Sequence, residues 1–202
     1  MNEFISLVNF ISLIVSAILS FYIYTLSVMP VTREQKKGKK AWKESSRLRI
    51  IADIIWTLFI LNFILWIWFP VKSINWPISH DYITLFIISI LFMVPFLIIT
   101  FKAVKDAGSE TVITSEENEM YGGIYKYIRH PQMLGASPLI LLICCLLNSL
   151  FLLIWFSILV VIIVPIVIYF EEKDLLLRFG ESYKEYQAKT GAIIPQFWRK
   201  KQ

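Results

Sequence analysis

The sequence contains few of the residues from which disulfides, metal sites and glycine-rich loops are built. Two cysteines and two histidines occur among its 202 residues, and no glycine-rich dinucleotide-binding fingerprint is present. Cys144 and Cys145 are adjacent in an apolar run. Neighbouring side chains of a helix point in different directions, so we expect small buried residues and no disulfide. The two histidines have no matched ligands around them, and we predict no metal.

Signals for export and for nucleic-acid binding are missing as well. The chain starts Met1-Asn2-Glu3, without the positive region and small-residue cleavage site of a signal peptide, so we expect its first apolar segment to stay as a helix. The net charge of +5 is explained by basic residues beside anionic lipid headgroups. No recognition motif points to nucleic acid, and we predict no such partner.

Long apolar runs dominate the sequence, of which 57% is hydrophobic. An apolar block of about 18 or more residues is typical of a membrane-spanning helix. We therefore predict an all-α integral membrane, multi-pass protein with five transmembrane helices. The corresponding blocks are residues 4–29, 50–69, 82–101, 133–147 and 150–170. The first three make up region 1–101, and the last two belong to region 102–202.

The basic residues are distributed unevenly among the connecting segments. Segments 32–49, 102–132 and 171–202 contain eight, four and seven lysines and arginines, whereas Lys72 is the only one in the segment 71–81. Because cytoplasmic loops carry an excess of basic residues, we place the N-terminus outside and the C-terminus in the cytosol. Residues 32–49 are then a basic cytosolic loop. Which membrane holds the protein is left open.

Two polar clusters are expected to meet at the cytosolic face. Asn148-Ser149 is the one plausible turn between the fourth and fifth blocks, so we predict a tight helical hairpin over 133–170. The hairpin returns Glu171-Glu172 to the depth of Arg129-His130-Pro131. Singly, each cluster has a structural explanation, because proline suits a first helical turn and charged residues anchor helix ends at headgroups. Together they indicate a site for a polar cofactor beside the bilayer.

The flanking residues make the pattern more specific. Residues 123–131 read Gly-Ile-Tyr-Lys-Tyr-Ile-Arg-His-Pro, and the two glutamates are followed by Phe179-Gly180 and Tyr183. The pattern resembles the isoprenylcysteine carboxyl methyltransferase family and the related membrane phospholipid methyltransferases, over roughly residues 108–197. The resemblance implies an integral membrane methyltransferase that uses S-adenosyl-L-methionine, with 102–202 as its methyltransferase region of cofactor loop, hairpin and cytosolic tail.

The resemblance also implies roles for individual residues. Glu171, Glu172 and Arg129 would be catalytic. The cofactor would be bound by Tyr125, His130, Pro131, Gln132, Met133, Glu171 and Met120. Methyl transfer from a sulfonium mainly requires positioning and desolvation of the partners. Arg129 or His130 could hold the carboxylate of the cofactor, while the acceptor, a lipid or prenylated small molecule, enters from the bilayer.

Two positions depart from the family pattern and leave the acceptor open. Met133 stands where a tyrosine is frequent, and Val167 stands where prenylcysteine methyltransferases carry an arginine for the substrate carboxylate. Lys126, Lys173 or Arg178 are candidate replacements. If the acceptor is instead a phospholipid or another amine lipid, Glu172 is the candidate base. A non-enzymatic membrane protein or an inactive family member is the alternative of another class.

Two further features have both a structural and a functional interpretation. Asp53 lies about one turn inside the second span, where it either reaches the interface or marks a functional site. Leu175, Leu176, Phe179, Tyr183 and Tyr186 recur mostly at three- or four-residue spacing. This spacing predicts an amphipathic C-terminal helix on the cytosolic surface, as a lid over the cofactor or as a surface helix.

Overall fold

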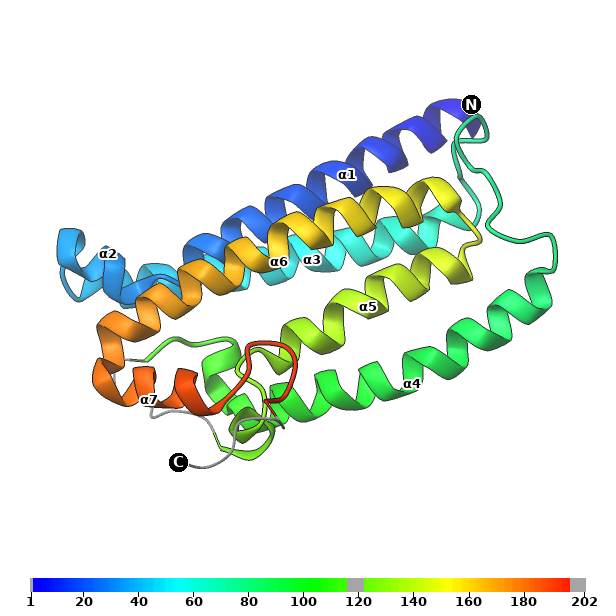
Figure 1. Ribbon diagram of the computed structural model, residues 1–202. Coiled ribbons are helices and arrows are strands. Elements are labelled where there is room, and N and C mark those ends of the chain that lie inside the picture. The colour runs from blue at the N-terminus through cyan, green and yellow to red at the C-terminus, as the bar shows by residue number, and fades with distance from the viewer. Residues whose placement is uncertain (1, 116–121, 197–202) are drawn as a thin grey trace.

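The computed structural model describes residues 2–115 and 122–196, and within these ranges every regular element is a helix (Figure 1). The α-helices are α1 (Asn2–Ser27), α2 (Pro30–Lys37), α3 (Lys40–Trp66), α4 (Tyr82–Ala107), α5 (Pro131–Leu146), α6 (Leu150–Phe179) and α7 (Glu181–Lys189). Two 3₁₀ turns, η1 (Gly108–Thr111) and η2 (Gly123–Lys126), flank the undescribed stretch. The prediction of an all-helical protein is confirmed.

Four helices are long and apolar enough to cross a membrane, namely α1, α3, α4 with its continuation into η1, and α6. They make this a membrane-embedded protein. Helix α5 is also apolar but has 16 residues. At 1.5 Å per residue it is roughly 24 Å long, shorter than the bilayer core of about 30 Å. Four of the five expected spans are therefore present by length and composition.

The basic stretch 32–49 is helical, which corrects the expectation of a loop. Gly38, with a φ of +66°, ends α2, and α3 begins at Lys40, well before its apolar block. The first turn of α2 is capped from another helix. The Asp174 carboxylate of α6 accepts from Val31 N at 3.2 Å and Thr32 N at 2.7 Å. This contact satisfies two backbone donors that a helix start leaves free.

The C-terminal part also differs from the expectation of a single amphipathic helix. Helix α6 does not end near Phe170 but runs on to Phe179, so Leu175 and Leu176 belong to the long helix. Gly180, with a φ of +58°, ends it, and α7 starts at once in a new direction. The break arises because glycine adopts this left-handed conformation without a Cβ clash.

The apolar core joins α1, α3, α5 and α6, and α5 packs most extensively against α4. Phe59, Phe63 and Phe156 are fully or almost fully buried at the centre of the core. Gly135 allows α5 to approach α4 closely, because a Cβ at this position would lie 2.8 Å from the backbone nitrogen of Thr100.

Each end of the bundle gathers connections that are distant in sequence. At one end, the α5–α6 connection meets the loop after α3. Leu150 N donates to Trp76 O at 2.8 Å, and Asn148 Oδ1 accepts from Ile78 N at 2.8 Å. The opposite end, which we call the α7 end, carries α2 and α7 (Figure 1). Helices α5 and α6 are closest at their connection and separate toward the α7 end.

Candidate functional site

The two polar clusters meet at the α7 end. His130 Nδ1 lies 3.2 Å from Glu171 Oε2, and His130 Nε2 lies 3.0 Å from Glu172 Oε1. Arg129 Nε lies 2.7 Å from the same Glu172 oxygen. We call Arg129, His130, Glu171 and Glu172 the His130 cluster. The expectation that these residues are neighbours is confirmed by these contacts.

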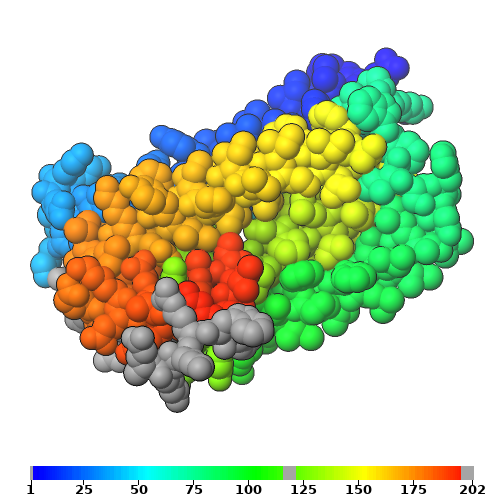
Figure 2. All heavy atoms as spheres, in the orientation of Figure 1, coloured from blue at the N-terminus to red at the C-terminus, as the bar shows by residue number. Residues whose placement is uncertain are grey.

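The C-terminal segment holds the cluster in place, and this contribution was not predicted from the sequence. Arg129 N donates to Gly191 O at 2.9 Å, and His130 N donates to Ala192 O at 2.9 Å. The Arg129 guanidinium also donates to the carbonyls of Gln187 and Thr190. Residues 187–192 therefore fix both the backbone and the side chain of Arg129. In Figure 2 this part of the chain covers the α7 end beside α6.

The charges within the cluster balance. Burial lowers the pKa of His130, but hydrogen bonds to the Glu171 and Glu172 carboxylates outweigh it and raise the pKa to about 9. His130 is therefore an imidazolium at neutral pH, and two cations face two carboxylates. Both ring nitrogens of His130 are directed to glutamates, and Arg129 is directed to Glu172 and backbone carbonyls. The expected contact of these two residues with a cofactor carboxylate finds no support in this arrangement.

A cavity that opens to the surface adjoins the cluster. The predicted residues Tyr125, Arg129, His130, Gln132, Met133 and Glu171 all line it. Pro131 is buried at the first position of α5 and does not line the cavity. Glu172 also lies outside the lining and faces Arg129 and His130 instead. Met120 falls outside the described residues.

Tyr125 is positioned by a short turn that α4 and α7 both hold. Gly123 has a φ of +60°, and the Asp106 carboxylate at the end of α4 accepts from Ile124 N at 2.7 Å. The Tyr186 hydroxyl of α7 donates to the Tyr125 carbonyl. Burial raises the pKa of the Tyr125 hydroxyl, which stays neutral at physiological pH.

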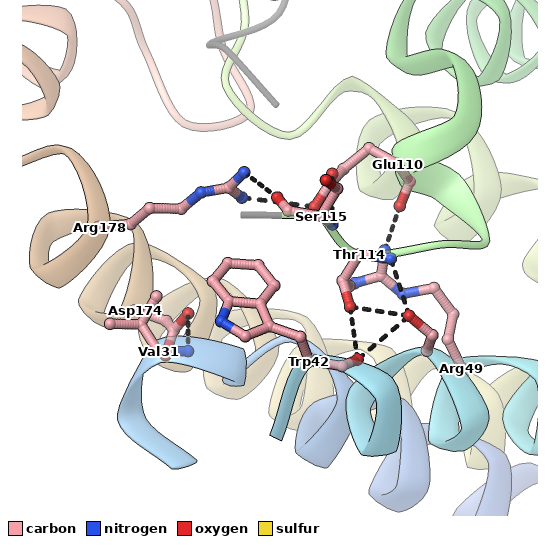
Figure 3. Close-up of polar contacts among 9 residues, drawn as sticks. Val31, Trp42, Arg49, Glu110, Thr114, Ser115, Asp174 and Arg178 are labelled. Carbon is pink, nitrogen blue, oxygen red and sulfur yellow. Dashed lines mark hydrogen bonds and ion pairs between the residues drawn. The ribbon is translucent and has the colours of Figure 1, made fainter. Parts of the chain in front are cut away.

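A second group of polar residues that line the cavity lies around Glu110, and of its two arginines only Arg178 was singled out from the sequence (Figure 3). Arg178 lies 3.4 Å from Glu110, donates to the Ser115 carbonyl, and places its guanidinium carbon 5.0 Å from the Trp42 ring centre. Arg49 donates to the Glu110 carbonyl. Arg49 could have been found from helical spacing, because Trp42, Ser45 and Ala52 place it on one stripe of α3.

The neighbouring Asp53 of α3 has the opposite orientation. Asp53 is exposed on the outer face of the bundle, and it does not line the cavity. The functional interpretation of this carboxylate finds no support.

The position of the missing family arginine is apolar and closed. Val167 is fully buried within the bundle, one turn before Glu171, and does not line the cavity. Of the three candidate replacements for the family arginine, Lys126 and Lys173 are exposed and do not line the cavity. Arg178 does line the cavity. Besides Arg129 and His130, the cationic side chains that line the cavity are thus Arg178 and Arg49.

Within residues 2–115 and 122–196, no group of histidine, cysteine and carboxylate side chains is arranged to hold a metal ion. In comparisons with known proteins, no family model, no curated protein and no solved structure matches the chain. The fold and the site define a class: a helical membrane protein with a charged, partly enclosed cavity at one end of its bundle. A more particular assignment rests on the chemistry of that cavity.

Proposed function

We propose that the protein is a membrane methyltransferase that uses S-adenosyl-L-methionine and acts on a membrane-borne acceptor, with the carboxylate of an isoprenylcysteine-type compound as the preferred substrate. The observation that carries the proposal is the convergence of Arg129, His130 and Glu171 on one cavity at the end of an apolar bundle. A cavity in this place opens to water for a polar cofactor and adjoins the bilayer for a lipid.

The residues of the cavity fit this cofactor. Glu171 Oε2 accepts from His130, which leaves Oε1 to accept from the cofactor's amino group. Two buried polar atoms of cavity-lining residues, Arg49 Nε and Tyr183 Oη, have no hydrogen-bond partner among the described residues. Such orphaned donors are expected where a ligand completes the hydrogen bonding. When bound, the cofactor would supply the methyl group on its sulfonium.

The residues of the protein would position the cofactor and the acceptor and exclude water from them. The His130 cluster fixes Glu171 through a charged hydrogen bond, so the carboxylate is preorganised before any ligand binds. Tyr125, Met133 and Leu175 contribute apolar surface that excludes water from the cavity. Water exclusion and fixed geometry are the main demands of an in-line methyl transfer.

The contacts of Glu172 favour a carboxylate acceptor over an amine. Glu172 accepts from Arg129, His130 and Gln187, at 2.7, 3.0 and 2.8 Å. A carboxylate that accepts three such bonds is a weak base. An amine lipid would have to lose a proton before attack, whereas an acceptor carboxylate is already ionised at neutral pH. Phospholipid N-methylation therefore has less support than carboxyl methylation.

The proposal includes five spans, with the N-terminus outside and the cavity on the cytosolic face. It is supported by the position of the two ends of α5. Its first residue adjoins α7, and the connection after it hydrogen-bonds to the loop that contains Trp76 and Ile78. Helix α5 runs from that connection toward the α7 end, although its 16 residues make it shorter than α4 and α6 (Figure 1).

Cofactor binding to the purified protein in detergent tests the proposal. We expect wild type to bind S-adenosyl-L-methionine and Glu171→Gln to bind it about tenfold or more weakly, because a hydrogen bond to a charged group is lost. Glu181→Gln is the matched control, since the Glu181 side chain is 82% exposed and pairs with Lys184. Isothermal titration calorimetry measures all three affinities. A wild type that binds no cofactor would be a non-enzymatic protein or an inactive family member.

A further inference from the structure

Arg49 is a buried cation on the packing face of a membrane helix. Its side chain projects from the buried stripe of α3, and the residue is 7% exposed. Burying a guanidinium in apolar surroundings is costly unless its donors are paired. An arginine within a buried stripe of tryptophan, serine and alanine is therefore unusual, and its stability there depends on the groups that contact the guanidinium.

The partners of Arg49 within the described chain are neutral. One terminal nitrogen donates to the Glu110 carbonyl, and the guanidinium carbon lies 5.9 Å from the centre of the Tyr24 ring. Its Nε is buried and has no hydrogen-bond partner there. None of the ion pairs formed between described residues includes Arg49. The guanidinium is thus held by neutral groups and forms no direct ion pair with another described residue.

Arg49 lines the same cavity as Arg129, His130 and Glu171 of the His130 cluster. Arg49 and Tyr24 line it from α3 and α1, and Glu171 lines it from α6. The charges of Arg49 and Glu171 are close enough to interact. A ligand in this cavity could therefore meet both a cation and a carboxylate. Arg178 also lines the cavity, but its guanidinium pairs with Glu110 and Ser115.

We propose that Arg49 binds a carboxylate group in this cavity and so replaces, from α3, the cation that Val167 cannot supply from α6. The inference rests on the proposed function for the identity of the ligand. A carboxylate occurs at the amino-acid end of S-adenosyl-L-methionine and on a prenylcysteine acceptor. Arg129 and His130 are engaged by Glu171 and Glu172, which leaves Arg49 as the donor for either group.

Two ligand pairs separate the two sources of the carboxylate. S-adenosylhomocysteine and 5′-methylthioadenosine share the nucleoside and the thioether, but the second lacks the amino-acid carboxylate. N-acetyl-S-farnesylcysteine and its methyl ester differ in a free carboxylate alone. Binding of all four to wild type, Arg49→Gln, Arg49→Lys and Arg47→Gln is measured in detergent. Arg47 lies two residues away on the same helix and is exposed. Arg47→Gln is therefore the control that removes one positive charge from α3 outside the cavity.

We expect Arg49→Gln to bind at least one of the two carboxylate ligands about tenfold or more weakly than wild type does. The affinity of Arg49→Gln for the matched ligand without the carboxylate should be unchanged, as should all four affinities of Arg47→Gln. Loss of S-adenosylhomocysteine alone assigns Arg49 to the cofactor, and loss of the farnesylcysteine acid alone assigns it to the acceptor. Arg49→Lys keeps the charge without the planar fork and should recover part of the affinity.

The outcomes that overturn the inference are distinct from failure of the proposed function. If wild type binds no S-adenosylhomocysteine but prefers the farnesylcysteine acid to its ester through Arg49, the methyltransferase proposal fails and the inference stands. If Arg49→Gln keeps its melting temperature and binds all four ligands like wild type, the inference fails. Should Arg49→Gln not fold, the wild-type comparison decides: equal affinity within both ligand pairs also refutes a carboxylate site.

Discussion

His130 is the residue on which the electrostatics of the site depend. It is 5% exposed and touches both glutamates, so a neutral imidazole would leave two buried carboxylates opposite Arg129 alone. Protonation is therefore part of the folded state.

The raised pKa of His130 predicts a pH-dependent stability. The ordinary pKa of 6.5 rises to about 9 in the folded protein, so the stabilisation is fully present below about pH 6.5 and is lost as the pH rises through 9. We expect the melting temperature of wild type in detergent to fall between pH 7 and 9.5, by an amount equivalent to at most about 3 kcal/mol.

His130→Gln is the control for this prediction, because its amide keeps hydrogen-bonding capacity but does not titrate in this range. Its melting temperature should be lower than that of wild type at pH 6.5 and should vary less between pH 7 and 9.5. Parallel curves for the two proteins would show that His130 is not charged in the folded state.

At the scale of elements, the contact between α4 and α5 positions the start of the site. Helix α5 begins with Pro131 directly after His130. Asp106, near the end of α4, accepts a hydrogen bond from Ile124 N in the turn that contains Tyr125. The two helices approach through Gly135, whose missing side chain leaves room for the backbone of Thr100. Small residues at such contacts are common in membranes, where van der Waals packing is a main source of helix association.

Gly135→Ala should therefore destabilise the protein. The added Cβ would lie 2.8 Å from Thr100 N and 3.0 Å from Phe96 O, so one helix has to shift. Overpacking of this kind costs roughly 1–3 kcal/mol, and we expect the melting temperature to fall by several degrees. Gly122→Ala is the control, since a Cβ there meets no atom within 4 Å. Equal melting temperatures for both variants would contradict the close contact.

At the scale of the whole molecule, the charges and the connections agree on one orientation. The segments rich in lysine and arginine, α2, the start of α3 and α7, lie at the α7 end (Figure 1). The loop with Lys72 and the α5–α6 connection lie together at the other end. By the positive-inside rule, this distribution supports the proposed orientation, in which the cavity lies at the cytosolic face.

Accessibility of single cysteines tests the five-span proposal. In a Cys144→Ala, Cys145→Ala background, Ser73→Cys and Ser182→Cys probe two exposed sites at opposite ends. If α5 crosses the membrane, a membrane-impermeant maleimide labels Ser73→Cys in intact cells and Ser182→Cys only after permeabilisation. Without that crossing, both cysteines would lie on the same side and label together. The reverse pattern would invert the proposed orientation.

The sequence by itself determined the membrane class, the helical fold and the meeting of Arg129-His130 with Glu171-Glu172. These features follow from local quantities, because span length, basic loops and a short turn can be counted along the chain. The basic stretch 32–49 was expected to be a loop because its many charged residues leave no apolar pattern that predicts a helix. The capping of α2 by Asp174 could not be predicted either, because Asp174 lies more than 140 positions away in the sequence.

The tertiary structure alone decided what completes the site. Whether a charged residue faces lipid or cavity depends on the rotation of its helix against its neighbours, which is why Asp53 lies outside and Arg49 inside. The backbone contacts of residues 187–192 with Arg129 and His130 carry no side-chain signature either. The meeting of Arg129 and His130 with the two glutamates could thus be predicted from the sequence, whereas the place of Arg49 in the lining of the cavity depends on how the helices pack.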